Sequence, residues 1–357
     1  MKKQKNVFRV SALASAVLGA FAANTYAADD EVAQLIKPDS SISVGVGNQN
    51  NDRMRLGIYD GQQDKGAYGL VDADIKLRDD ATGTWNELRL NNLGLDNREV
   101  FVSHSRQGDY GASFEYSRIP RESHYTVNTK LQYGDRGNNT IQETVPAVFT
   151  PGTGYNLRLG TVRDRYTLSI DKLLGGAFEF NAKYRQEEKQ GRRFFSAYNG
   201  SVTQFLFEPI DTVTRQLDLM GSYLGKNLQL QAGYYGSWFR NDDSLIRFTS
   251  TSAATTNYVS LPPDNQAHQF YLNGAYTFTP TTKANFRMAR TVASQDDRSL
   301  LSAIPAAGGS VSPSFHGVNA KVVTTEYQMG LSSNPIKNLS LTANLHYHDR
   351  DDQTPYV

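Results

Sequence analysis

The sequence predicts an all-β protein that forms a large antiparallel transmembrane β-barrel with short periplasmic turns and long extracellular loops. Three observations support this prediction. Segments of about 9–11 residues alternate between apolar and polar side chains. Short turns alternate with long polar segments. The composition combines 20 Tyr, 17 Phe and 29 Gly with a mean hydropathy of −0.52, as expected when half of the strand residues face lipid and half face water.

Four segments show the alternation most clearly, and each has the length of a tilted strand that crosses a bilayer. They are Ala177–Arg185, Asn227–Tyr235, Gln269–Phe278 and Asn338–His348. The polar positions of these segments and of their neighbours are predicted to face the lumen. The predicted lumen residues are Glu179, Asn181, Lys183, Arg185, Gln229, Gln231, Asn273, Asn285, Arg287, Glu326 and Gln328.

Connections of two kinds separate the alternating segments. The predicted short turns are Leu173–Gly176, Leu224–Asn227, Thr279–Thr282 and Ser332–Lys337. The predicted long outer loops, of roughly 25–30 residues, are Gln186–Thr214, Asn241–Asn265 and Val292–Val323. Tyr223 and Phe278 precede short turns, whereas Trp238 and Phe239 precede a long loop. Aromatic residues at both strand ends are typical of interfacial girdles and disfavour a soluble β-sandwich.

The first 160 residues contain further strand-like segments. These are Ser41–Gly47, Arg53–Tyr59, Gly69–Leu77, Glu87–Asn91, Arg98–Ser105 and Gly111–Arg118. Their up and down directions do not agree with those of the later hairpins if every segment crosses the membrane. We therefore expect one missed or one extra strand in this region.

The N-terminus is predicted to be an export signal that is cleaved. Lys2, Lys3, Lys5 and Arg9 precede an apolar stretch, and Thr25-Tyr26-Ala27 carries small residues where a signal peptidase reads. The predicted domains are therefore a signal peptide in residues 1–27 and the barrel in residues 28–357, exported through the Sec pathway to the outer membrane of a Gram-negative cell. Removing the four basic residues leaves a net charge of −3, which gives no support for nucleic-acid binding.

The end of the chain is expected to leave the barrel incomplete. Leu339–His348 runs outward, and the following Asp349–Val357 is polar and contains Pro355, which a central strand does not accept. A closed barrel needs further strands to pair its edges within the membrane. We expect roughly 14–16 strands here and more than about 20 in a complete barrel with a lumen wide enough to hold a plug.

Several ordered motifs between residues 40 and 121 resemble one known family. They are Ser40–Gly47, Gly57–Gly61, Gly69–Asp74, Arg78–Trp85, Asn92–Glu99 and Tyr116–Arg121. Together they are similar to the N-terminal part of the decahaem-associated outer-membrane proteins of the MtrB/PioB type. The later hairpins fit that family in their rhythm. Some members carry a C-x-x-C near the mature N-terminus, but this chain has no Cys.

The resemblance implies a barrel that acts as a sheath. Its lumen would hold a periplasmic multihaem c-type cytochrome across the outer membrane, and an extracellular multihaem cytochrome would dock outside. Electrons would then pass between the periplasm and external acceptors or donors, in metal reduction or iron oxidation. The chain would carry no cofactor of its own, and the haem would belong to the partner. A general or substrate-specific porin is the alternative.

No catalytic, cofactor-binding or metal-binding residue is predicted. His346 and His348 share the predicted lumen face, but two ligands do not make a metal site, and we interpret both as solvated. Asp296-Asp297-Arg298 and Asp349–Asp352 are interpreted as solvated loop charges. Because no motif combines a nucleophile with a His base, we also expect the protein not to be an enzyme.

Overall fold

The computed structural model describes residues 39–129, 131–133, 140–143, 152–198, 203–243, 245–250, 255–297 and 318–355. These residues form strands and one short 3-10 helix, η1 (Leu56–Ile58). The predicted export signal in residues 1–27 lies outside them. In this described part of the chain, no helix has the length and hydrophobicity needed to span a membrane.

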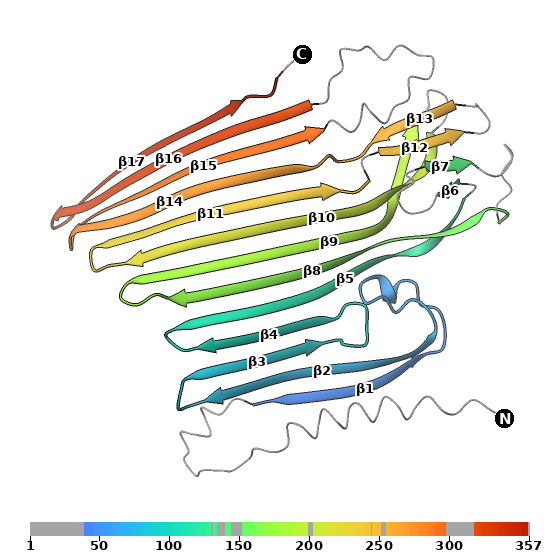
Figure 1. Cartoon of the computed structure of the whole chain (residues 1–357), viewed down its shortest axis with the longest axis horizontal. Coiled ribbons are helices and arrows are strands. Elements are labelled where there is room, and N and C mark those ends of the chain that lie inside the picture. The colour runs from blue at the N-terminus through green and yellow to red at the C-terminus, as the bar shows by residue number, and fades with distance from the viewer. Residues whose placement is uncertain are drawn as a thin grey trace, which may run out of the picture. The chain divides into compact units, whose positions relative to one another are not determined.

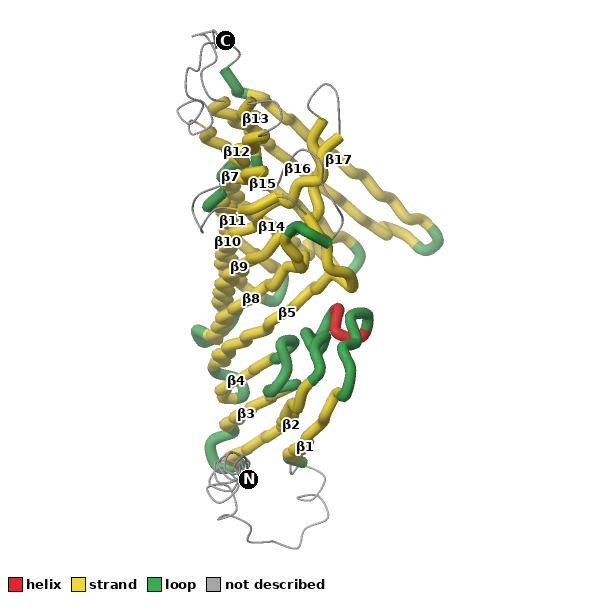
Figure 2. Tube along the Cα trace, turned by 90° about the vertical axis from the view of Figure 1, so that its right-hand side faces the viewer, coloured by secondary structure: helices red, strands yellow, loops and turns green. Residues whose placement is uncertain are grey.

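The principal element is a 13-stranded sheet whose strands follow one another in chain order (Figure 1). The strands are β1 (Ser41–Gln49), β2 (Gly66–Asp79), β3 (Thr84–Asn91), β4 (Glu99–Arg106), β5 (Tyr110–Thr129), β8 (Tyr155–Leu173), β9 (Phe178–Tyr198), β10 (Thr203–Leu224), β11 (Leu228–Asn241), β14 (Asn265–Thr279), β15 (Thr282–Asp297), β16 (Val318–Ile336) and β17 (Leu339–Asp352). Every neighbouring pair is antiparallel, and β1 and β17 form the two edges. Figure 2 shows that this sheet is curved. The sheet thus has 13 described strands, compared with the roughly 14–16 expected, and four further short strands belong to a separate sheet.

One face of the sheet is apolar over all thirteen strands. The register aligns Phe114 with Leu168, Leu168 with Tyr184, and Tyr184 with Leu217. Phe270, farther along the same face, is 64% exposed. Large apolar side chains that no protein atoms cover are the expected surface of a strand that faces hydrocarbon. The period-2 pattern in the sequence is therefore a real division between two faces.

Short turns join the strands at one end of the sheet. They are residues 80–83, 107–109, 174–177, 225–227, 280–281 and 337–338, and at the other end every connection except the one between β9 and β10 is longer (Figure 1). With short turns on the periplasmic side, β1 runs outward and all later strands agree in direction. The predicted turn Ser332–Lys337 is displaced, because β16 continues to Ile336 and Asn338 takes a left-handed φ of 66° in the turn.

The predicted strand Arg53–Tyr59 is wrong, and this error explains the conflict in strand directions. The segment lies in the β1–β2 connection and forms η1. The amides of Leu56 and Gly57 both donate to the carbonyl of Arg53, at 3.0 and 3.3 Å, which coils the chain instead of extending it. Gly57 is buried where a Cβ atom would lie 2.4 Å from Cγ of Gln63. The loop therefore packs through a glycine.

The predicted long loop Gln186–Thr214 is also wrong. Here β9 and β10 remain paired from Tyr223↔Phe178 to Thr203↔Tyr198, so the connection between them is only residues 199–202. Beyond Tyr184 the outward side chains of β9 become polar, although the backbone ladder continues. These two strands extend past the apolar band: residues 186–193 of β9 carry no apolar side chain, and farther out Phe195 and Phe207 pack in a separate buried cluster. Of the predicted loop Val292–Val323, residues 298–317 lie outside the described residues.

A second, smaller sheet lies at the long-loop end (Figure 1). It consists of β6 (Leu131–Tyr133), β7 (Thr140–Glu143), β12 (Leu245–Ser250) and β13 (Thr255–Ser260), with β7 and β12 parallel. It combines two connections that are far apart in sequence, β5–β8 and β11–β14. Ile141 and Ile246 are fully buried and pack in one cluster with Leu159 and Phe207 from the extended ends of β8 and β10.

Candidate functional site

The candidate site is the polar face of the 13-stranded sheet, opposite the apolar face. The register aligns Gln231 with Asn273, Asn273 with Arg287, and Arg287 with Gln328. It also aligns Lys183 with Asp218, which pairs on with Tyr235. All eleven predicted lumen residues lie on this face: Glu179, Asn181, Lys183, Arg185, Gln229, Gln231, Asn273, Asn285, Arg287, Glu326 and Gln328.

The middle of the polar face is hollowed and rich in amides. A depression of about 690 Å³ extends over β9, β10, β11, β14, β15 and β16, and its polar lining includes Gln229, Gln231, Asn273, Asn285 and Gln328. The Asn273 side chain donates to Oε1 of Gln231 at 3.0 Å, whereas its own Oδ1 is buried without a partner among the described residues. Amide side chains of this kind carry both hydrogen-bond donors and acceptors.

The N-terminal strands carry a denser set of charges on the same face, and the sequence analysis did not identify them. Lys76 lies opposite Glu87, and Asp74 lies opposite Arg89. Lys76 also bonds Asp74 at 2.9 Å. Their signal was present in the sequence, because Asp72, Asp74 and Lys76 are two residues apart. Both charge signs are therefore interleaved on this part of the polar face.

The two predicted lumen histidines lie on this face near its edge. His346 is aligned with Gln328, and His348 with Glu326. Nδ1 of His348 lies 3.3 Å from Oε1 of Glu326, and the two imidazole rings are 6.5 Å apart between centroids. Among the residues that the structure describes, no three His, Asp or Glu side chains group closely enough to hold a metal ion. His348 thus forms a polar contact with Glu326.

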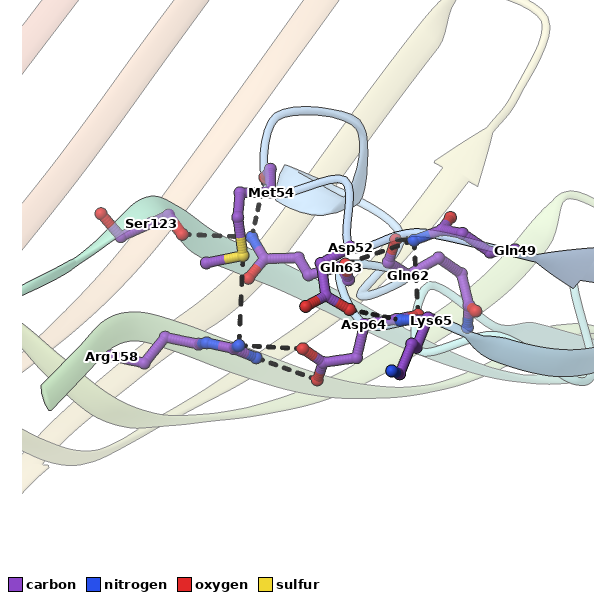
Figure 3. A network of polar contacts seen from close by, with 9 residues as sticks. All are labelled: Gln49, Asp52, Met54, Gln62, Gln63, Asp64, Lys65, Ser123 and Arg158. Carbon is purple, nitrogen blue, oxygen red and sulfur yellow. Dashed lines mark hydrogen bonds and ion pairs between the residues drawn. The ribbon is translucent and has the colours of Figure 1, made fainter. Parts of the chain in front are cut away.

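The outer rim is organised by the β1–β2 loop, which is fastened to β5 and β8 (Figure 3). Gln63 is 1% exposed, and its Nε2 donates to the carbonyls of Met54 and Ser123, each at 3.1 Å. The Arg158 guanidinium donates to both carboxylate oxygens of Asp64, at 2.9 and 3.0 Å. These hydrogen bonds hold the pKa of the Asp64 carboxyl below its ordinary value. The loop is thereby held as an ordered part of the rim.

Comparison with known proteins identifies the family to which this architecture belongs. The family described as "Putative outer membrane beta-barrel porin, MtrB/PioB" matches residues 48–357. The chain belongs to the MtrB/PioB family. It is also 26% identical over 331 residues to the outer membrane protein MtrB of Shewanella baltica strain OS185, an alignment that covers 88% of this chain and 46% of that protein. The chain thus spans about half the length of its curated MtrB relative.

Solved structures with a detectable likeness include two forms of OmpT, an outer membrane protein of Vibrio cholerae. A loop L8 deletion mutant matches with a TM-score of 0.33 and 9% identity, over 87% of this chain and 94% of that one. The protein expressed in the outer membrane matches with a TM-score of 0.32 and 10% identity, over 88% and 89%. The MtrB/PioB family match establishes that this chain is an outer-membrane β-barrel protein.

Proposed function

We propose that this MtrB/PioB family member is a sheath that holds a periplasmic multihaem c-type cytochrome across the outer membrane for electron transfer. One observation carries the proposal: the apolar face continues over thirteen strands while the opposite face is predominantly polar. A cytochrome with a polar exterior cannot lie in hydrocarbon, because its charged and hydrogen-bonding groups would lose water. A sheet with these two faces supplies lipid contact on one side and a polar environment on the other.

The polar face supports contact with a protein through its chemistry. Its amides offer both donors and acceptors, and its charges alternate in sign. Arg89 and Glu87, for instance, are joined at 2.5 Å and remain part-exposed, at 46% and 23% of their side chains. Such side chains can replace hydrogen bonds to water with hydrogen bonds to a partner protein at a small cost in free energy. In this proposal the protein is not an enzyme, has no cofactor of its own, and positions haems that belong to the held cytochrome. An extracellular multihaem cytochrome would dock at the long-loop end.

The test is gentle purification of the protein from outer membranes, followed by measurement of haem absorbance per barrel. A fixed, stoichiometric haem content supports the sheath, and a haem-free barrel contradicts it. The matched variants are Lys183→Glu with Arg287→Glu on the polar face, and Lys226→Glu in the exposed β10–β11 turn. We expect the first pair to lower haem retention and the turn variant to leave it unchanged. Equal haem retention in the polar-face variants and in the turn variant would argue against the polar face as the binding surface.

A porin is the second candidate, because the matching family is described as porin-like and the polar face contains an amide-lined hollow. Amides and arginines that line water also suit the passage of polar solutes. Single-channel conductance separates the two functions. A sheath conducts little while the haem protein is bound and more after its removal, whereas a porin conducts when purified alone and contains no haem.

A further inference from the structure

A second pocket lies on the polar face near its outer end. It has a volume of about 290 Å³. Its lining combines apolar residues such as Ile210 and Phe239 with charged and hydroxyl side chains from β8, β9 and β10: Arg163, Glu187, Lys189, Arg193, Glu208, Thr212 and Thr214. Lys189 is aligned with Thr212, and Thr212 with Asn241, so the three lie in one row across adjacent strands.

The carboxylates of this pocket are already engaged. Glu187 bonds Arg163 at 3.0 Å and also Arg165 at 2.9 Å. Glu208 is 6% exposed and bonds Arg193 through two oxygens, at 2.5 and 2.9 Å. Two acidic groups are thus shared among three arginines. The ammonium group of Lys189, in contrast, has no hydrogen bond or ion pair with a described residue, and the cations that line the pocket outnumber its carboxylates.

Lys189 is partly buried beside these arginines. Burial lowers the pKa of its ammonium group, and the nearby charges of Arg163 and Arg193 lower it further. Lys189 lies beyond the apolar band, because the outward side chains of β9 that directly follow Tyr184 are polar. Glu187 and Glu208 act on this pKa in the opposite direction, but both carboxylates are engaged by arginines. An anion that enters the pocket would therefore stabilise the Lys189 ammonium group.

We propose that this pocket is an oxyanion site, in which Lys189 binds a carboxylate or phosphate group and the hydroxyls of Thr212 and Thr214 lie within the same pocket to donate to it. Two sources could present that chemistry: a dissolved anion in the lumen, or a surface carboxylate of the held protein. The second source rests on the proposed sheath function, whereas the first does not. In either case the site would hold an acidic group at a fixed position at the outer mouth of the barrel.

The test measures the labelling rate of Lys189 by a lysine-selective acylating reagent, read by mass spectrometry on the wild-type barrel. In the haem-free barrel, Lys183, an exposed lysine of the same strand and face, is the internal control, and in the haem-containing preparation the control is Lys226 of the exposed β10–β11 turn. A bound anion raises the pKa of Lys189 by about one unit and therefore slows its labelling about tenfold below that pKa. We expect acetate or inorganic phosphate to slow labelling of Lys189 and to leave Lys183 unchanged. Equal responses of the two lysines to both anions would overturn the proposal.

A second arm identifies the source of the anion. The haem-containing preparation is labelled without added acetate or phosphate. Protection of Lys189 there assigns the site to a carboxylate of the held protein, and full reactivity there, with protection by added anion in the free barrel, assigns it to a dissolved anion. If no haem co-purifies, the sheath function fails, while the free-barrel arm still decides whether the oxyanion site exists.

Discussion

A charge placed on the apolar face should cost far more than the same charge one residue away on the polar face. Leu272 lies on β14 between Ala232 and Met288 and is 37% exposed on the apolar side. An arginine near the bilayer midplane on this side costs about 2–4 kcal/mol. The neighbouring Asn273 faces the amide-lined hollow, where an arginine meets mainly the like charge of Arg287, at a cost below about 1 kcal/mol.

The two variants are compared by urea titration of the protein reconstituted in lipid vesicles. The fluorescence of Trp238, at the outer end of the apolar face, reports folding. Since 1.4 kcal/mol is a factor of ten, Leu272→Arg should reduce the folding equilibrium constant roughly 30- to 700-fold. Asn273→Arg should reduce it about fivefold at most. Equal losses, or a larger loss for Asn273→Arg, would refute the assignment of lipid and lumen faces.

Three further predictions concern the outer rim and strand packing. Arg158→Gln should weaken docking of the loop 50–65 by roughly 0.2–1 kcal/mol, because the pair is largely exposed, and limited proteolysis should cut that loop up to about fivefold faster. The pKa of Asp64 is lowered in the folded state. The stabilisation that its carboxylate gives to the loop is therefore complete above about pH 3.9 and is lost as the pH falls through the lowered pKa. Hydrogen exchange of the loop should rise only under strong acid. Gly191→Ala should cost roughly 1–3 kcal/mol in urea titration, because the residue has a φ of 140° and a Cβ would lie 2.2 Å from a β8 carbonyl oxygen. Gly221→Ala, with open space around its Cβ, is the control.

The parts of the fold that sequence predicts well are those where two solvents impose a period of two. The turn Leu224–Asn227 and the strand that begins at Ser41 were placed correctly because apolar and polar positions alternate around them. The period disappears in residues 186–193, where both faces carry polar side chains, and the apolar residues that follow serve a separate cluster. Gln186–Thr214 therefore resembles a loop in sequence, although its backbone remains paired as the extended ends of β9 and β10.

Local coiling is the opposite difficulty. In Arg53–Tyr59 the apolar Met54, Leu56 and Ile58 alternate as in a strand, but Gly57 packs against Gln63 and the chain turns. Alternation alone does not record such a tertiary contact. The candidate site shows both effects. Its central amides follow from the period, whereas the pocket around Lys189 lies within the segment interpreted as a loop and becomes visible only through strand pairing.

The small sheet at the outer end has a mechanical consequence. Its strands belong to two connections that are separated by about a hundred residues of chain, yet they share one dry cluster around Ile141 and Ile246. The spanning strands between β5 and β14 are thus tied together above the membrane as well as within it. Loosening of either connection releases the other, so the mouth of the barrel should yield to force or protease as one cooperative unit rather than loop by loop.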